Sequence, residues 1–122
     1  MANEITYTGT MKFAKNSVAL YVGSTDMSIT VSGDHIVHRT QEVGFASAEA
    51  LSIGEITTVG LAWFRNMDAT NYVEIGYDDS GFKNLIKLKA GEQFGPVRLG
   101  QNAPYAQANT GAVDLEYVLI ED

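Results

Sequence analysis

The chain has 122 residues, of which 45% are apolar, and it carries a formal net charge of −7. This length suits one domain covering residues 1–122, and the apolar content excludes general disorder. The acidic balance repels phosphate backbones and excludes nucleic acid as an expected partner. There is no cysteine, so disulfides play no part in the fold. The sequence shows neither a signal peptide nor an apolar stretch of about 20 residues, so we expect no contact with a membrane.

The first third of the chain has a period of two, in which apolar and polar side chains alternate as they do along a half-buried strand. Residues 1–16 alternate in this way and are rich in Thr; we interpret them as an ordinary first strand in preference to an arm that pairs with a neighbour. Residues 18–22 are apolar at every position, which predicts a strand covered on both faces. Residues 27–31 alternate again, and the mostly polar residues 36–43 predict an edge strand.

The rest of the chain continues as short segments of this kind, separated by turns rich in Asn, Asp and Gly. Residues 60–66 are the strongest candidate for a central strand, and a regularly alternating last strand begins at Val113. Residues 101–111, which contain Tyr105, are expected to form an irregular loop. Further strands are expected at residues 73–77, 85–89 and 94–99, and a short one at Leu51 and Ile53 after a loop at residues 44–50.

This pattern predicts the class of fold. It amounts to about eight to ten short strands spaced roughly 8–12 residues apart, with turn signals between them. We find no helical stripe, internal repeat or linker in the sequence. The prediction is an all-β, single-domain antiparallel β-sandwich of jelly-roll-like form, with an immunoglobulin-like strand order left open.

The two histidines, His35 and His38, are the first candidates for metal ligands. Three residues apart on one strand, they point to opposite faces and cannot hold one metal ion together. Zinc would need further ligands that the sequence does not cluster near them. The oxygen-rich turns at residues 68–71 and 78–81 lack the spacing of a calcium loop and are explained as turns. We therefore expect no metal site.

No residue is assigned a catalytic role. Glu74 and Glu116 alternate with apolar neighbours, and nothing distinguishes them from the wet face of an ordinary strand, although paired carboxylates are the groups that glycoside hydrolysis needs. The glycines are dispersed among turns and form no phosphate-binding loop. The sequence thus predicts a protein that is not an enzyme and binds no cofactor.

Aromatic side chains suggest a binding role, because exposed rings stack on sugars and anchor protein contacts. Trp63 lies in an apolar run and is predicted to pack in the core. Tyr105, in its expected loop, is the aromatic residue most exposed to a partner, and Tyr72 is the second candidate. Tyr105 and Tyr72 are therefore the predicted partner contacts.

Several phrases of the second half of the chain resemble small virion accessory proteins of tailed bacteriophages. They are residues 64–76, a strand ending in an Asn-x-Asp turn and then a strand ending in Gly; residues 88–92, with an Ala-Gly-Glu turn; and residues 105–109 and 115–117. The resemblance covers roughly the half of the chain from Gly60 onward and rests on the order and spacing of the phrases.

This resemblance implies an architectural role in a virion assembled in the cytoplasm of a bacterial host. The expected function is that of a capsid decoration (cement) protein, which stabilises the shell through oligomeric contacts. The expected partners are the phage major capsid protein or other virion subunits, and further copies of the chain in a homotrimer or homodimer. The alternatives are a tail-associated subunit and a carbohydrate-binding module for host recognition.

Overall fold

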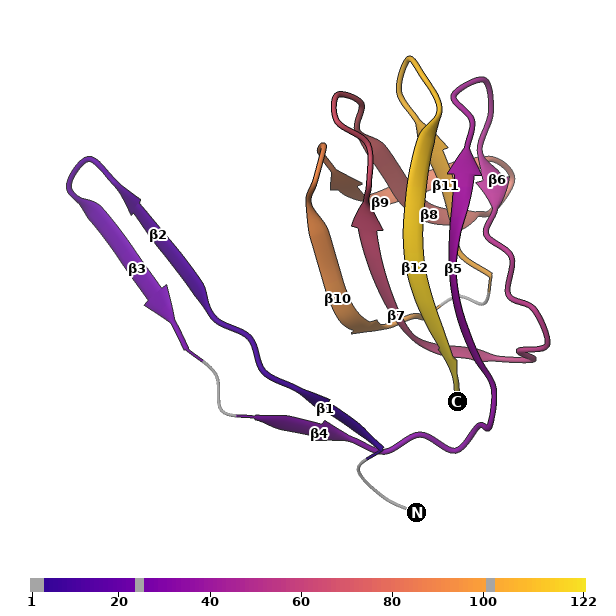
Figure 1. Cartoon of the computed structure of the whole chain (residues 1–122), viewed down its shortest axis with the longest axis horizontal. Coiled ribbons are helices and arrows are strands. Elements are labelled where there is room, and N and C mark those ends of the chain that lie inside the picture. Colours follow the sequence, from indigo (N-terminus) through magenta and orange to yellow (C-terminus); the bar gives the residue numbers. More distant parts are fainter. Residues whose placement is uncertain (1–3, 24–25, 101–102) are drawn as a thin grey trace. The chain divides into compact units, whose positions relative to one another are not determined.

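The computed structural model describes residues 4–23, 26–100 and 103–122, and every regular element in them is a β-strand (Figure 1). The chain divides into two units, Met1–Ser32 and Gly33–Asp122, which we call the arm and the body. The predicted all-β class is confirmed. The predicted antiparallel sandwich is confirmed too, and the body forms it.

The arm is built from two antiparallel ladders. β2 (Met11–Lys15) pairs with β3 (Val18–Val22), and β1 (Ile5–Tyr7) pairs with β4 (Met27–Ile29). A two-residue turn joins β2 to β3, and its Asn16 has a φ of 56°, a left-handed conformation that Asn tolerates better than most residues. The alternation read in residues 5–13 therefore belongs to one side of a hairpin.

Two four-stranded antiparallel sheets make up the body. The front sheet in Figure 1 has the order β10-β7-β12-β5, and the rear sheet has the order β6-β11-β8-β9. Consecutive strands along the chain are distributed over both sheets in the double Greek-key manner of a jelly roll, which settles the strand order. Within its described residues the body has eight strands: β5 (Ile36–Val43), β6 (Glu49–Ala50), β7 (Val59–Asn66), β8 (Val73–Asp78), β9 (Phe82–Leu88), β10 (Gln93–Arg98), β11 (Tyr105–Ala108) and β12 (Val113–Glu121).

The core lies between these two sheets and follows from the alternation in sequence. The inward residues of β12 are fully buried: Val113, Leu115, Tyr117 and Leu119. β12 lies between β5 and β7, so its backbone is hydrogen-bonded on both sides. The hydroxyl of Tyr117 donates a 2.8 Å hydrogen bond to the carbonyl of Ser52, which removes the penalty for burying it.

Several sequence predictions about single strands are confirmed. Residues 60–66 belong to β7, which has neighbours on both sides, and residues 36–43 form β5 at the edge of the front sheet. The turn at residues 78–81 closes with Ser80 and Gly81 at positive φ and with the Gly81 amide bonded to the Asp78 carboxylate at 3.2 Å. Turn chemistry therefore located these ends correctly.

Other predictions are wrong. Tyr105 does not lie in a loop but begins β11, because residues 105–108 pair with β8 on one side and β6 on the other. The short strand near residue 50 is Glu49–Ala50, inside the predicted loop, and residues 51–53 lie outside any strand. Residues 18–22 are not covered on both faces: every one of them is exposed. Long-range pairing, which local pattern does not encode, decides the outcome for Tyr105 and for residues 49–50. Residues 18–22 pair only with the adjacent β2, and their exposure reflects the lack of a second layer.

Candidate functional site

The arm exposes apolar side chains that have no core of their own. All ten residues of β2 and β3 are exposed, although most are apolar. Phe13 is 48% exposed and Leu20, its cross-strand partner, is 50% exposed. A two-stranded hairpin is only marginally stable by itself, because a single layer has nothing to pack against. The β2–β3 hairpin thus presents its apolar side chains on an exposed surface.

The two faces of the β2–β3 hairpin differ. The strand register places Met11 opposite Val22, Phe13 opposite Leu20, and Lys15 opposite Val18 on one face. We call this the Phe13 face. The other face carries Ala14, Ala19, and the Lys12–Tyr21 pair, in which the ammonium lies 5.5 Å from the ring centroid. The Phe13 face is therefore apolar with one cation at its tip end.

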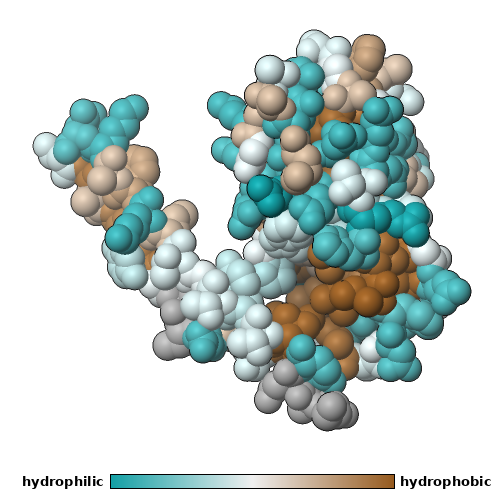
Figure 2. Space-filling view, viewed as in Figure 1, coloured by the Kyte–Doolittle hydropathy of each residue, from teal (hydrophilic) through white to brown (hydrophobic). Residues whose placement is uncertain are grey.

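A second apolar surface lies on the outer face of the front sheet. Two rows of side chains cross β5, β12 and β7 there: Ile36–Ile120–Leu61 and His38–Val118–Trp63. We call Ile36, Trp63, Val118 and Ile120 the apolar patch; Leu61 faces the same side but is fully buried. Ile36 is 64% exposed, and Figure 2 shows apolar surface on this face of the body. Trp63 is half-buried on this outer face and not in the core, so its predicted place is wrong; its neighbours Ala62 and Phe64 point inward.

The other end of the same face is acidic. Glu42 of β5 lies directly opposite Asp114 of β12, and both side chains are exposed. Like charges at paired positions repel each other. No ion pair found among the described residues involves either carboxylate. A cation brought to this end from outside the body would relieve the repulsion.

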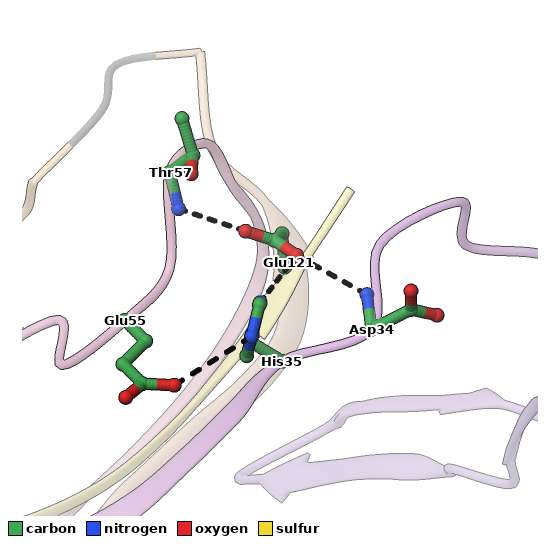
Figure 3. A network of polar contacts seen from close by, with 5 residues as sticks. All are labelled: Asp34, His35, Glu55, Thr57 and Glu121. Carbon is green, nitrogen blue, oxygen red and sulfur yellow. Dashed lines mark hydrogen bonds and ion pairs between the residues drawn. The ribbon is translucent and has the colours of Figure 1, made fainter.

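A network of polar contacts fixes the segment through which the body continues into the arm (Figure 3). One carboxylate oxygen of Glu121 accepts hydrogen bonds from the amide of Asp34 at 3.1 Å and from Nδ1 of His35 at 2.9 Å. The other accepts from the amide of Thr57 at 2.8 Å. Nε2 of His35 lies 3.7 Å from the Glu55 carboxylate. The chain just before β5 is thus tied to the end of β12.

The charges of this network favour one another. Hydrogen bonds from Thr57, His35 and Asp34 lower the pKa of Glu121 to about 2. The same Glu121, through its hydrogen bond and its charge, raises the pKa of His35 above its ordinary value. A side chain at Gly33 would collide with Glu121, so glycine is required where the segment passes this residue. This cluster could not be predicted from local sequence pattern, because residues 34–35, 55–57 and 121 lie far apart along the chain.

The predicted partner contacts Tyr72 and Tyr105 share one face, the outer face of the rear sheet. Tyr105 is paired with Gly76 of β8, and Tyr72 precedes β8 by one residue. Both rings are half-buried. Gly76, the cross-strand partner of Tyr105, lies four residues beyond Tyr72, so the two tyrosines are roughly 13 Å apart along the sheet. The Lys87 ammonium lies 4.0 Å from the centre of the Tyr72 ring, so part of that ring is occupied.

The histidines and carboxylates singled out in the sequence do not converge. His35 bonds Glu121, whereas Nε2 of His38 lies 2.8 Å from the carboxylate of Glu116. Glu74 and Glu116 point outward from the rear and front sheets, on opposite sides of the sandwich. No group of three or more acidic or histidine side chains in the described residues is placed to hold a metal ion.

The body also has an open pocket of about 280 Å³, lined mainly by Phe64, Ile75, Tyr77, Leu85, Ile86 and Leu99. None of the described residues that line it is charged. It can offer apolar contact and one phenolic hydroxyl, but no acid, base or ion partner. Its lining suits an apolar group.

The phrases that carry the phage resemblance meet at one end of the sandwich, around the fully buried Asn66. The amide nitrogen of its side chain donates to the carbonyls of Asn71 and Leu88 at 2.9 and 3.0 Å, and its oxygen accepts from the Asp68 amide at 2.8 Å. The backbone of Asn66 bonds Glu92 and Gly91. Asn66 therefore joins the turn at residues 66–71 to the turn at residues 88–92, and a structural role accounts for these phrases.

Comparison with protein-family models, with curated proteins and with solved structures finds no match for the chain. The described residues contain no helix with the length and apolarity that a membrane span requires. Evidence about function therefore comes from the surfaces described above, of which the arm departs furthest from the surface of an ordinary folded domain.

Proposed function

We propose that the chain is a non-enzymatic structural subunit of a bacteriophage virion, and specifically a capsid decoration (cement) protein that stabilises the shell through contacts between subunits. The observation that carries this proposal is the arm, whose apolar side chains Met11, Phe13, Leu20 and Val22 are all about half exposed. Apolar surface of this kind is typical of a contact element that becomes buried in an assembly.

The body suits the same role. Two packed sheets form a rigid unit, and the front sheet ends at edge strands β5 and β10, whose outer backbone groups can pair with a neighbouring strand. A cement protein bridges shell subunits that internal pressure pushes apart, and it requires a stiff body with a projecting contact. The order of the phage-like phrases in the second half of the sequence supports placing this architecture in a virion.

The test is the composition and strength of phage particles. Particles purified from a host that expresses the gene should contain the chain in many copies, as measured by mass spectrometry. Particles from a deletion strain should release their DNA at lower temperature, and adding the purified protein should restore stability. A chain found only in the soluble lysate, with particles unchanged by its deletion, would overturn the proposal.

A carbohydrate-binding module is the second candidate, and the observation that favours it is the common face of Tyr72 and Tyr105. Glu74 and Gln107 lie paired on that face and offer hydrogen bonds beside the rings. A glycan panel titrated against tryptophan and tyrosine fluorescence tests this role. Binding that is lost in the Tyr105→Ala variant would support it, and a flat response to the whole panel would eliminate it.

A further inference from the structure

We infer that the Phe13 face of the arm packs on the outer face of the front sheet in a second copy of the chain. The inference rests on the proposed role of the arm as the contact element and names the surface that receives it. Both surfaces belong to this sequence, so every copy gives one arm and accepts another. Such an exchange closes a dimer when it is reciprocal and a trimer when it runs in a ring.

The spacing of side chains on the two surfaces agrees. On the Phe13 face, four residues of strand, about 13 Å, separate the apolar Met11 from Lys15. On the front sheet, four residues of β12 separate the apolar Val118 from Asp114. When the apolar rows of the two surfaces face each other, Lys15 lies toward the acidic end of the sheet.

Charge supplies the second argument. Residues 11–22 hold Lys12 and Lys15 and no acid, whereas the whole net charge of −7 falls on the body, because the arm's acids and bases cancel. The exposed Glu42 and Asp114 repel each other across the ladder. A lysine from another copy would neutralise this repulsion while the apolar side chains are buried together.

The pocket of the body fits the arm less well. Its lining can accept an apolar side chain but has no acid for Lys15. The outer face of the rear sheet has a different charge pattern, because Lys87 of β9 lies directly opposite Glu74 of β8 there. The front sheet has the apolar patch at one end and the Glu42–Asp114 pair at the other, with Arg65 of β7 opposite Glu116 in the row between them.

The first experiment measures self-association of the full-length chain by sedimentation equilibrium and light scattering. Phe13→Ser should raise the dissociation constant about tenfold or more, since an apolar anchor is lost from the contact. Tyr21→Ser, on the opposite face of the same hairpin, is the matched control and should change it less than about threefold. A chain that is monomeric throughout, or equal losses in both variants, would overturn the inference.

A charge exchange tests the acidic end separately. Lys15→Glu should weaken association about tenfold, whereas Lys12→Glu on the other face should have a much smaller effect. Combining Lys15→Glu with Asp114→Lys should return the dissociation constant to within about threefold of the original. No recovery in the double variant would place the lysine elsewhere and contradict the inference.

Cross-linking decides between a second copy and the same body. The chain has no cysteine, so Ser17→Cys at the hairpin tip and Thr40→Cys on the front sheet are unique sites. Mixing the two single variants with a short bis-maleimide should give a covalent dimer, and replacing Thr40→Cys with Asn84→Cys on the rear sheet should not. A link formed only inside a chain that carries both cysteines would overturn the inference.

Failure of this inference and failure of the proposed function have different signatures. Particles that bind the Phe13→Ser variant poorly, while self-association is unchanged, would leave a virion role in place and assign the arm to another virion subunit. Self-association that depends on Phe13, with no chain in any particle, would support the inference and refute the virion role.

Discussion

Phe13 in the arm and Phe64 in the body show how one side chain behaves with and without a second layer. Phe64 points inward from β7 and is completely buried between two sheets, whereas Phe13 is half exposed on a hairpin that lies in one layer. Both lie on strands with apolar alternation, so the strand pattern is shared. The difference is that a second sheet covers Phe64. Alternation in the sequence therefore predicts an apolar face on a strand, but it does not predict what covers that face.

Proteolysis gives the largest expected contrast between the two regions. Trypsin should cut after Lys12 and Lys15 at least about a hundredfold faster than within the body, because local opening of the arm breaks no core while cleavage of the body requires unfolding. Mass spectrometry of a digestion time course on dilute protein checks this. Raising the protein concentration should slow cleavage of the arm if another copy covers it, and cleavage of body and arm at equal rates would contradict the comparison.

Truncating each phenylalanine gives the next largest contrast. Phe64→Ala should lower the free energy of unfolding by about 3–5 kcal/mol through lost burial and a cavity. Phe13→Ala should change it by less than about 0.5 kcal/mol in dilute, monomeric protein. Urea unfolding followed by tryptophan fluorescence measures both, and a similar loss for the two variants would show that the arm is covered within its own chain.

Asn66 and Asn84 sharpen the comparison within the body. Asn66→Ala should lower the free energy of unfolding by about 2–3 kcal/mol, because the carbonyls of Asn71 and Leu88 lose their donor and the Asp68 amide loses its acceptor. Asn84→Ala, at an exposed position, should stay within about 0.5 kcal/mol of the unaltered chain. The same unfolding experiment measures both variants. A change of less than about 0.5 kcal/mol in the free energy of unfolding for Asn66→Ala would contradict a structural role for Asn66.

The polar network at the start of the body gives the smallest and most pH-dependent effect. The pKa of Glu121 is lowered from 4.5 to about 2, so its stabilisation is complete above pH 4.5 and is lost as the pH falls toward 2. The pKa of His35 is raised above 6.5, so its contribution is complete below pH 6.5 and is lost as the pH rises through the folded-state pKa. NMR titration should show the pKa of His35 falling in Glu121→Gln but hardly changing in the exposed Glu55→Gln. An unchanged value in Glu121→Gln would break this account.

The sequence predicted the body better than the arm for a physical reason. Alternation along β12 and the apolar run of β7 reflect burial on fixed faces, and Asn, Asp and Gly mark turns by their local backbone chemistry. β11 escaped notice because Ala106 and Ala108 are small and weak strand formers, so only their pairing with β8 makes them a strand. The prediction that Trp63 packs in the core was wrong because both faces of β7 carry apolar side chains. An apolar run of this kind does not indicate which face points toward the core.

The candidate surfaces were harder to foresee. Tyr72 and Tyr105 were chosen singly, and the structure brings them to one face of the rear sheet. The apolar run at residues 18–22 did contain the signal for the arm: it lies beside a strand with two lysines and no acid, and within the described residues it pairs with that strand alone. Glu42 and Asp114 lie opposite each other because of the register between β5 and β12, which are at opposite ends of the body's sequence. Local sequence pattern does not predict that register.

The hydrogen bonds of Glu121 also determine how the molecule responds to mechanical load. A pull applied to the arm enters the body at residues 33–35, which Glu121 ties to β12, and β12 is bonded along its length to both β5 and β7. Tension along these strands must therefore shear many backbone hydrogen bonds at once instead of opening them one after another. A subunit anchored by its arm would pass this load to β12, the strand that the front sheet holds on both sides.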